Sequence, residues 1–146
     1  MPDTRVLIVA PPSLAQLLQS TVSAAKNGSG IHVTGVAATT AEASALMAAE
    51  PPDILLIDLS ENSAGGLQAV QTLRECNPHV IMLAHVQAVD EDLIGQAIRL
   101  GVMGFVSVQE EIGAAIYMLL QGVSYLSPPA ARQFVLGLQH APHAKR

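Results

Sequence analysis

Residues 52–59 read PDILLIDL, an aliphatic run of strand length that carries the carboxylate of Asp58 near its end. Continuous aliphatic runs of this kind are typical of strands that are covered on both faces of a parallel sheet. The stretches RVLIVA at 5–10 and VIMLA at 80–84 have the same character. We therefore predict strands at Arg5–Ala10, Ile31–Ala37, Asp53–Leu59, Val80–Ala84 and Gly104–Ser107.

Segments with helical periodicity separate these strands. Thr39 and Glu42 have the spacing of a capping box, which predicts a helix that runs to Glu50. Further helices are predicted after a Ser13 cap and at Leu67–Cys76, Asp90–Leu100 and Gln109–Gln121. The strict alternation of strands and helices predicts an α/β fold built from βα units around a parallel sheet.

The composition is that of a small acidic domain. Of the 146 residues, 50% are hydrophobic and 13% are charged, and 12 acidic residues outnumber 7 lysines and arginines. This balance argues against nucleic-acid binding by the chain alone, and no apolar run approaches the roughly 18 residues of a membrane span. The N-terminus lacks the features of a signal peptide, and the single Cys76 excludes an intrachain disulfide. We expect a cytoplasmic protein with one domain at 1–127 and a C-terminal extension or linker start at 128–146.

The carboxyl ends of the predicted strands decide the chemistry, because ligands of open α/β sheets bind there. Asp58 is the only strong polar group at these ends. The chain has no glycine-rich phosphate loop and no nucleophile motif, and a single carboxylate does not hold a hard cation. The sequence therefore predicts neither catalytic residues nor a metal site nor a cofactor.

The order and content of these segments resemble response-regulator receiver domains, most closely the NarL-type subfamily. The resemblance covers about Thr4 to Pro128. The matching stretches are RVLIVA at 5–10, PDILLIDL at 52–59, GGLQAVQTLR at 65–74, VIMLAH at 80–85, AIRLGVMGFV at 97–106 and GVSYLSP at 122–128. The resemblance implies a flavodoxin-like (βα)5 doubly wound sandwich with a five-stranded parallel sheet in the order 2-1-3-4-5.

The resemblance also assigns site positions. It implies that Asp58 is equivalent to the phosphoacceptor aspartate and that Ser60 offers a backbone carbonyl to the metal. The family's two metal-binding acids fall on Ala10 and Pro11. Its hydroxyl residue falls on Ala84, its lysine on Val108 and its switch aromatic on Phe105.

Most of the phosphorylation apparatus is thus replaced, which predicts a degenerate pseudo-receiver. Phosphoryl transfer depends on neutralising the charge of the phosphoryl oxygens, and Ala10, Pro11 and Val108 cannot do so. The predicted function is signalling by phosphorylation-independent protein contact or dimerisation in transcription regulation. Two alternatives stay open: a conventional receiver that is phosphorylated on Asp58, and a small-ligand sensor with a pocket at Ala10, Pro11 and Asp58.

The environment of Asp58 also has two interpretations. The carboxylate can accept backbone N–H bonds from the loop that follows it. Alternatively it can pair with His85, which lies at the end of the neighbouring predicted strand, in a pH-sensitive contact. Phe105 can be a fixed aromatic instead of a switch, and the absence of a hydroxyl at Ala84 favours the fixed role.

The last predicted helix is apolar nearly all round, whereas a surface helix normally has a polar face. We therefore predict a homodimer through this helix, with the interface candidates Ile112, Ile116, Tyr117, Met118 and Leu120. The alternative is that the tail at Tyr125–Leu138 folds back over the helix. A histidine kinase or another regulatory protein is a further candidate partner. The resemblance implies nucleic-acid binding only through a domain that this chain does not contain.

Overall fold

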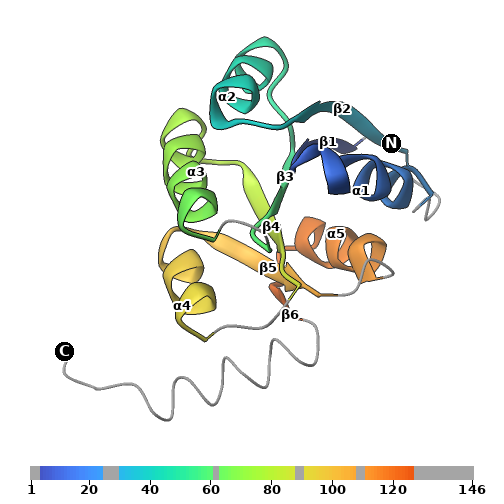
Figure 1. The fold of residues 1–146 in the computed structure, drawn as a ribbon. Coiled ribbons are helices and arrows are strands. Elements are labelled where there is room, and N and C mark those ends of the chain that lie inside the picture. The colour runs from blue at the N-terminus through green and yellow to red at the C-terminus, as the bar shows by residue number, and fades with distance from the viewer. Residues whose placement is uncertain (1–3, 25–29, 61–62, 88–90, 108–110, 127–146) are drawn as a thin grey trace.

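The computed structural model describes residues 4–24, 30–60, 63–87, 91–107 and 111–126. Within these residues a parallel sheet has the strand order β2-β1-β3-β4-β5-β6 (Figure 1). The strands are β1 (Thr4–Val9), β2 (Ile31–Ala37), β3 (Ile54–Asp58), β4 (Ile81–His85), β5 (Val102–Val106) and β6 (Tyr125–Leu126). The expected order 2-1-3-4-5 is confirmed, and the two-residue strand β6 extends it beyond β5.

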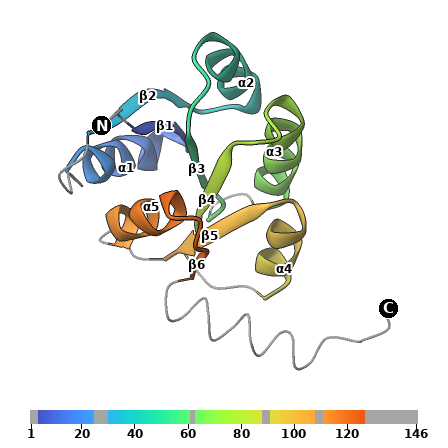
Figure 2. The ribbon, with the colours of Figure 1, turned by 180° about the vertical axis from the view of Figure 1, so that it is seen from behind.

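The helices lie on both faces of this sheet. They are α1 (Pro12–Ala24), α2 (Thr40–Ala49), α3 (Ser63–Cys76), α4 (Glu91–Arg99) and α5 (Ile112–Leu120). Helices α1 and α5 cover one face, whereas α2, α3 and α4 cover the other, as the two opposite views show (Figures 1 and 2). The flavodoxin-like α/β sandwich is therefore the fold of this chain.

The core consists of two apolar layers, one on each face of the sheet. Leu55 and Ile57 of β3 belong to the layer under α2, α3 and α4, and Ile54 and Leu56 belong to the layer under α1 and α5. Every residue of β3 is buried. The uninterrupted aliphatic run at 52–59 is thus explained by helices on both faces, which leave no exposed side for polar residues.

Local sequence signals place two of the helix ends. The Thr39 hydroxyl accepts the Glu42 N–H at 3.1 Å, and the Glu42 carboxylate accepts the Ala38 N–H at 2.8 Å, so α2 begins with reciprocal capping bonds. After α4, Gly101 adopts a φ of 102°, a conformation that favours glycine. The Arg74 guanidinium donates to the Gly101 carbonyl at 2.9 Å and to the Val80 carbonyl at 2.8 Å, which ties α3 to the residues directly before β5 and β4.

Helix α3 begins at Ser63, four residues before the predicted start at Leu67. The glycines at 65 and 66 suggested a loop because glycine disfavours helix interiors. A Cβ on Gly66 would lie 2.5 Å from Leu59 Cδ2. A side chain at position 66 would therefore displace the buried Leu59 side chain, which favours glycine in the first turns of this helix.

Candidate functional site

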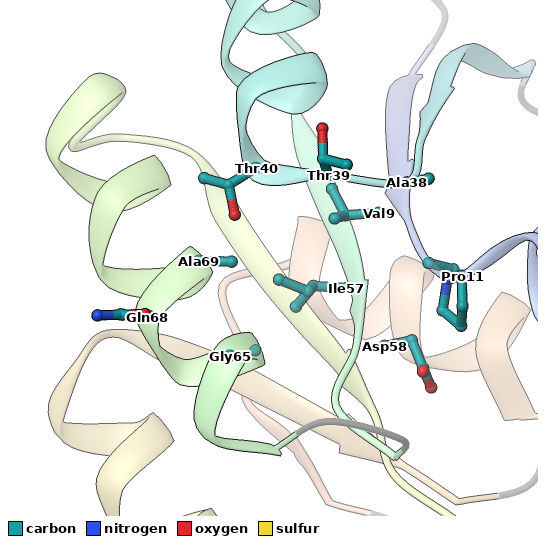
Figure 3. A pocket seen from close by; sticks show the side chains of 12 residues that line it. Val9, Pro11, Ala38, Thr39, Thr40, Ile57, Asp58, Gly65, Gln68 and Ala69 are labelled. Atoms are coloured by element: carbon teal, nitrogen blue, oxygen red, sulfur yellow. The ribbon is translucent and has the colours of Figure 1, made fainter.

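An open pocket of about 420 Å³ lies at the carboxyl ends of β1 and β3 (Figure 3). Strand order reverses between these two strands, and this is the position where open α/β sheets bind ligands. The pocket is lined by Val9, Ala10, Pro11, Ala38, Thr39, Thr40, Ile57, Asp58, Gly65, Gly66, Gln68 and Ala69. Among these described residues Asp58 is the only one with a charged side chain, and because that side chain is 1% exposed the pocket surface is essentially neutral.

Asp58 is the last residue of β3, and its side chain is paired inside the protein. His85, the last residue of β4, is its neighbour across the two parallel strands. His85 Nδ1 donates to Asp58 Oδ1 at 2.9 Å, and Ser60 Oγ donates to the same oxygen at 2.6 Å. The exposed fraction is 1% for the Asp58 side chain and 3% for the His85 side chain. The carboxylate therefore belongs to a buried polar cluster of Asp58, Ser60 and His85.

The environment of Asp58 favours its charged form. Burial raises the pKa of the Asp58 carboxyl, but the hydrogen bonds from His85 and Ser60 and the charge of His85 outweigh burial. The pKa consequently lies below its ordinary value of 3.8. Asp58 is therefore a carboxylate at neutral pH, and within the described part of the chain its Oδ2 atom is buried with no hydrogen-bond partner.

The two interpretations of Asp58 can now be compared. The pair with His85 is present, as a hydrogen bond between His85 Nδ1 and Asp58 Oδ1. A backbone contact from Ser60 also lowers the pKa of the Asp58 carboxyl, so the loop interpretation holds in part. Sequence reasoning did not count His85 among the site residues, and it assigned Ser60 only a carbonyl role. The available signal was that Asp58 and His85 end adjacent strands on the same face of the sheet.

The acidic positions of a receiver domain do not fit a magnesium ion in this chain. Ala10 is buried and Pro11 is partly exposed at the end of β1, and neither carries a side-chain oxygen. Mg²⁺ needs several oxygen ligands, and Asp58 Oδ1 already accepts two hydrogen bonds. Across the described ranges no group of three His, Cys, Asp or Glu side chains could hold a metal ion.

The two positions that the resemblance equates with a switch, Ala84 and Phe105, are occupied by packed apolar side chains. Ala84 and Phe105 are paired across β4 and β5, and both are fully buried in the layer under α2, α3 and α4. Phe105 thus has the position of a fixed core aromatic. Val108, the position of the family's lysine, lies outside the described residues.

Helix α5 shows that the interface prediction was partly wrong. Ile112 and Ile116 are buried against the sheet, because a helix on this face must bury one apolar stripe there. Tyr117 is 52% exposed and Leu120 is 42% exposed, while Met118 is partly exposed. Only these three of the five candidates can therefore contact a partner. The tail at 127–146, the alternative cover for this helix, lies outside the described residues.

Comparisons with known structures agree with this fold. A LuxR-family two-component response regulator from Aurantimonas has 22% identity and a TM-score of 0.81, with 95% of this chain and 100% of that chain covered. The signal receiver domain of the putative response regulator NarL from Mycobacterium tuberculosis has 25% identity and a TM-score of 0.68, with 83% and 99% covered. The Salmonella typhimurium response regulator RcsB has 13% identity and a TM-score of 0.78, with 92% and 67% covered.

Two further comparisons bear on identity. No curated protein sequence matches this chain. Among the described helices, none has the length and apolar character that crossing a membrane requires.

The family model of the response regulator receiver domain matches residues 11–115, which is most of the chain. The chain therefore belongs to the response regulator receiver domain family.

Proposed function

We propose that this receiver domain signals through protein contacts without phosphorylation of Asp58. The observation that carries the proposal is the buried cluster, in which Asp58 Oδ1 accepts hydrogen bonds from both His85 and Ser60. A carboxylate that attacks a phosphoryl donor must be reachable, and the Asp58 side chain is only 1% exposed. Receiver domains of response regulators are typically signalling domains and not enzymes, and we assign no catalytic residue to this one.

The residues around Asp58 support the same proposal. Phosphoryl transfer relies on positioning and on neutralising the charge of the phosphoryl oxygens. Ala10 and Pro11 supply no anionic ligand for a metal, and Ala84 supplies no hydroxyl for a phosphoryl oxygen. Asp58 therefore has a nucleophilic oxygen, but Ala10, Pro11 and Ala84, among the described residues, supply no group that would stabilise the transition state.

Incubation with acetyl phosphate and Mg²⁺ tests the proposal. The intact mass of the wild type is expected to stay unchanged. The intact mass of the control variant Asp58→Asn should also stay unchanged. Mg²⁺ alone should barely shift the melting temperature, because an ion that does not bind the native state does not stabilise it. A stoichiometric phosphoryl adduct in the wild type that is absent from Asp58→Asn would favour the conventional phospho-accepting receiver instead.

The pocket favours one second candidate function, the sensing of a small molecule. Its volume of about 420 Å³ falls within the range of small-molecule sites, roughly 300–1,000 Å³. Ala10 and Pro11 leave an uncharged wall, whereas an apolar ligand bound against acids at these positions would have to remove their hydration. A thermal-shift screen with metabolites tests this candidate, and a ligand whose stabilising effect is lost in Gln68→Trp would support it.

The described relatives suggest the biological setting. One is a LuxR-family response regulator, and another is shown as two RcsB dimers bound to two parallel DNAs. We propose a cytoplasmic role in transcription regulation, with the receiver domain at 1–127 and a C-terminal extension or linker start at 128–146. Nucleic-acid contact would need a separate DNA-binding domain, and a histidine kinase or another regulatory protein is a candidate partner.

We also propose that the domain forms a homodimer through α5. Tyr117 and Leu120 are exposed on this helix, and Leu17 of α1 is a further exposed apolar side chain on the same face of the sheet. Exposed apolar side chains that form a contiguous surface often mark a site of protein–protein contact.

Light scattering across a dilution series tests the dimer. The wild type is expected to dimerise at tens of micromolar without any phosphoryl donor, and Tyr117→Glu should shift it to the monomer by burying a charge in the interface. Gln71→Glu, on the exposed surface of α3, is the matched control and should leave the dimer intact. A wild type that remains monomeric would show that the exposed residues of α5 serve no self-association.

A further inference from the structure

His85 stands directly beside the carboxylate of Asp58. The two residues are partners across β3 and β4, so their side chains leave the same face of the sheet. His85 Nδ1 lies 2.9 Å from Asp58 Oδ1, and both side chains are almost completely buried. Figure 3 shows the Asp58 carboxylate turned away from Thr39 and Thr40.

We propose that His85 is an internal cap on Asp58, which closes the carboxylate to external reagents. The inference rests on the proposed function and deepens it, because it names the side chain that keeps the site shut. The missing acids at Ala10 and Pro11 explain why a phosphoryl group would not be stabilised. The cap explains why a donor does not reach the carboxylate in the first place.

The unpartnered oxygen of Asp58 supports the cap. Oδ2 is buried and has no hydrogen-bond partner among the described residues. Burying a charged oxygen without a hydrogen-bond partner is energetically costly. The Asp58 side chain is nevertheless only 1% exposed, so the protein holds this carboxylate away from the surface although its burial is unfavourable.

The backbone around His85 holds the cap in place. The His85 carbonyl accepts the Leu59 N–H at 2.8 Å, which joins the ends of β3 and β4 just beyond the paired side chains. The Val86 N–H donates to the Val106 carbonyl at 2.9 Å, which joins the same segment to β5. A movement that takes the imidazole away from Asp58 through the backbone would break these bonds together with the contact to Oδ1.

Carboxyl labelling tests the cap without phosphorylation chemistry. The folded protein is treated with a water-soluble carbodiimide and a small amine, and labelled carboxyls are located by peptide mass mapping. In the wild type the exposed Glu50 and Glu75 should be labelled and Asp58 should not. His85→Ala removes the ring and should raise labelling of Asp58 at least tenfold, while Glu50 and Glu75 are labelled as before.

Two control variants separate the cap from general loosening. His85→Gln retains a side chain of similar length with an N–H donor, and Asp58 should stay protected in it. Ser60→Ala removes the other hydrogen bond but leaves the ring, and it should also stay protected. If His85→Ala does not fold, as judged by circular dichroism, His85→Ser is used, with the same tenfold increase expected.

The cap would be overturned if Asp58 of the wild type were labelled as fast as Glu75. It would also be overturned if Asp58 stayed unlabelled in folded His85→Ala or His85→Ser. Either result leaves the proposed function standing as long as acetyl phosphate adds no phosphoryl group. A phosphoryl adduct on wild-type Asp58 would instead overturn the proposed function. Labelling of His85→Ala without phosphorylation of that variant would support both proposals.

Discussion

His85→Leu is expected to lower the free energy of unfolding by about 3–5 kcal/mol, although leucine is apolar and of similar volume. The reason is that Asp58 would keep its charge in a buried site while losing one of the two hydrogen-bond donors at Oδ1. The cost of the buried charge could be reduced only if the carboxylate took up a proton or if water entered the site. Both changes would disrupt the cluster. Urea denaturation of the wild type and the variant at pH 7 measures the difference.

Two further variants identify the origin of this loss. The double variant Asp58→Leu with His85→Leu should recover most of the stability, because replacing a buried pair by apolar side chains is often neutral. His79→Leu, at an exposed position, should change the free energy of unfolding by less than about 0.5 kcal/mol. A loss below about 1 kcal/mol for His85→Leu would mean that the carboxylate is solvated and that the pair contributes little.

Phe105→Ala is also expected to cost about 3–5 kcal/mol, the usual effect of emptying a buried aromatic site. Phe105 is fully buried beside Ala84, which carries no hydroxyl group. Phe105→Leu, which keeps most of the volume, should cost less than about 1.5 kcal/mol. Denaturation curves measure both, and a small cost for the alanine variant would indicate an aromatic that leaves the core, as a switch residue does.

The sheet could be predicted from the sequence because burial on two faces leaves a distinct pattern. Aliphatic runs at 5–10 and 52–59 became β1 and β3, whose side chains fill both apolar layers. The predicted strand Asp53–Leu59 is one residue longer at each end than β3, which runs from Ile54 to Asp58. The capping bonds of Thr39 and the positive φ of Gly101 likewise depend on nearby residues, so local sequence was sufficient to place them.

Features that depend on contacts between distant residues were predicted less well. Gly66 belongs to α3 because of its approach to Leu59, and helix propensity does not contain that information. The burial of Ile112 and Ile116 followed from the side of α5 that meets the sheet, which an all-apolar helix does not reveal. The role of His85 depended on the register between β3 and β4, so the sequence could offer the Asp58 pair only as one alternative.

Titration of the ¹⁵N-labelled protein with beryllofluoride and Mg²⁺, followed by amide spectra, most directly tests the claim that Asp58 is closed to phosphorylation. Beryllofluoride imitates a phosphoryl group on a reachable carboxylate, so its binding needs the same access and the same charge neutralisation. The account predicts no saturable shifts for the amides of Leu59, Ser60 and Val86, in the wild type or in Asp58→Asn. Saturable shifts at these residues in the wild type alone would contradict it and would establish a receiver that responds through Asp58.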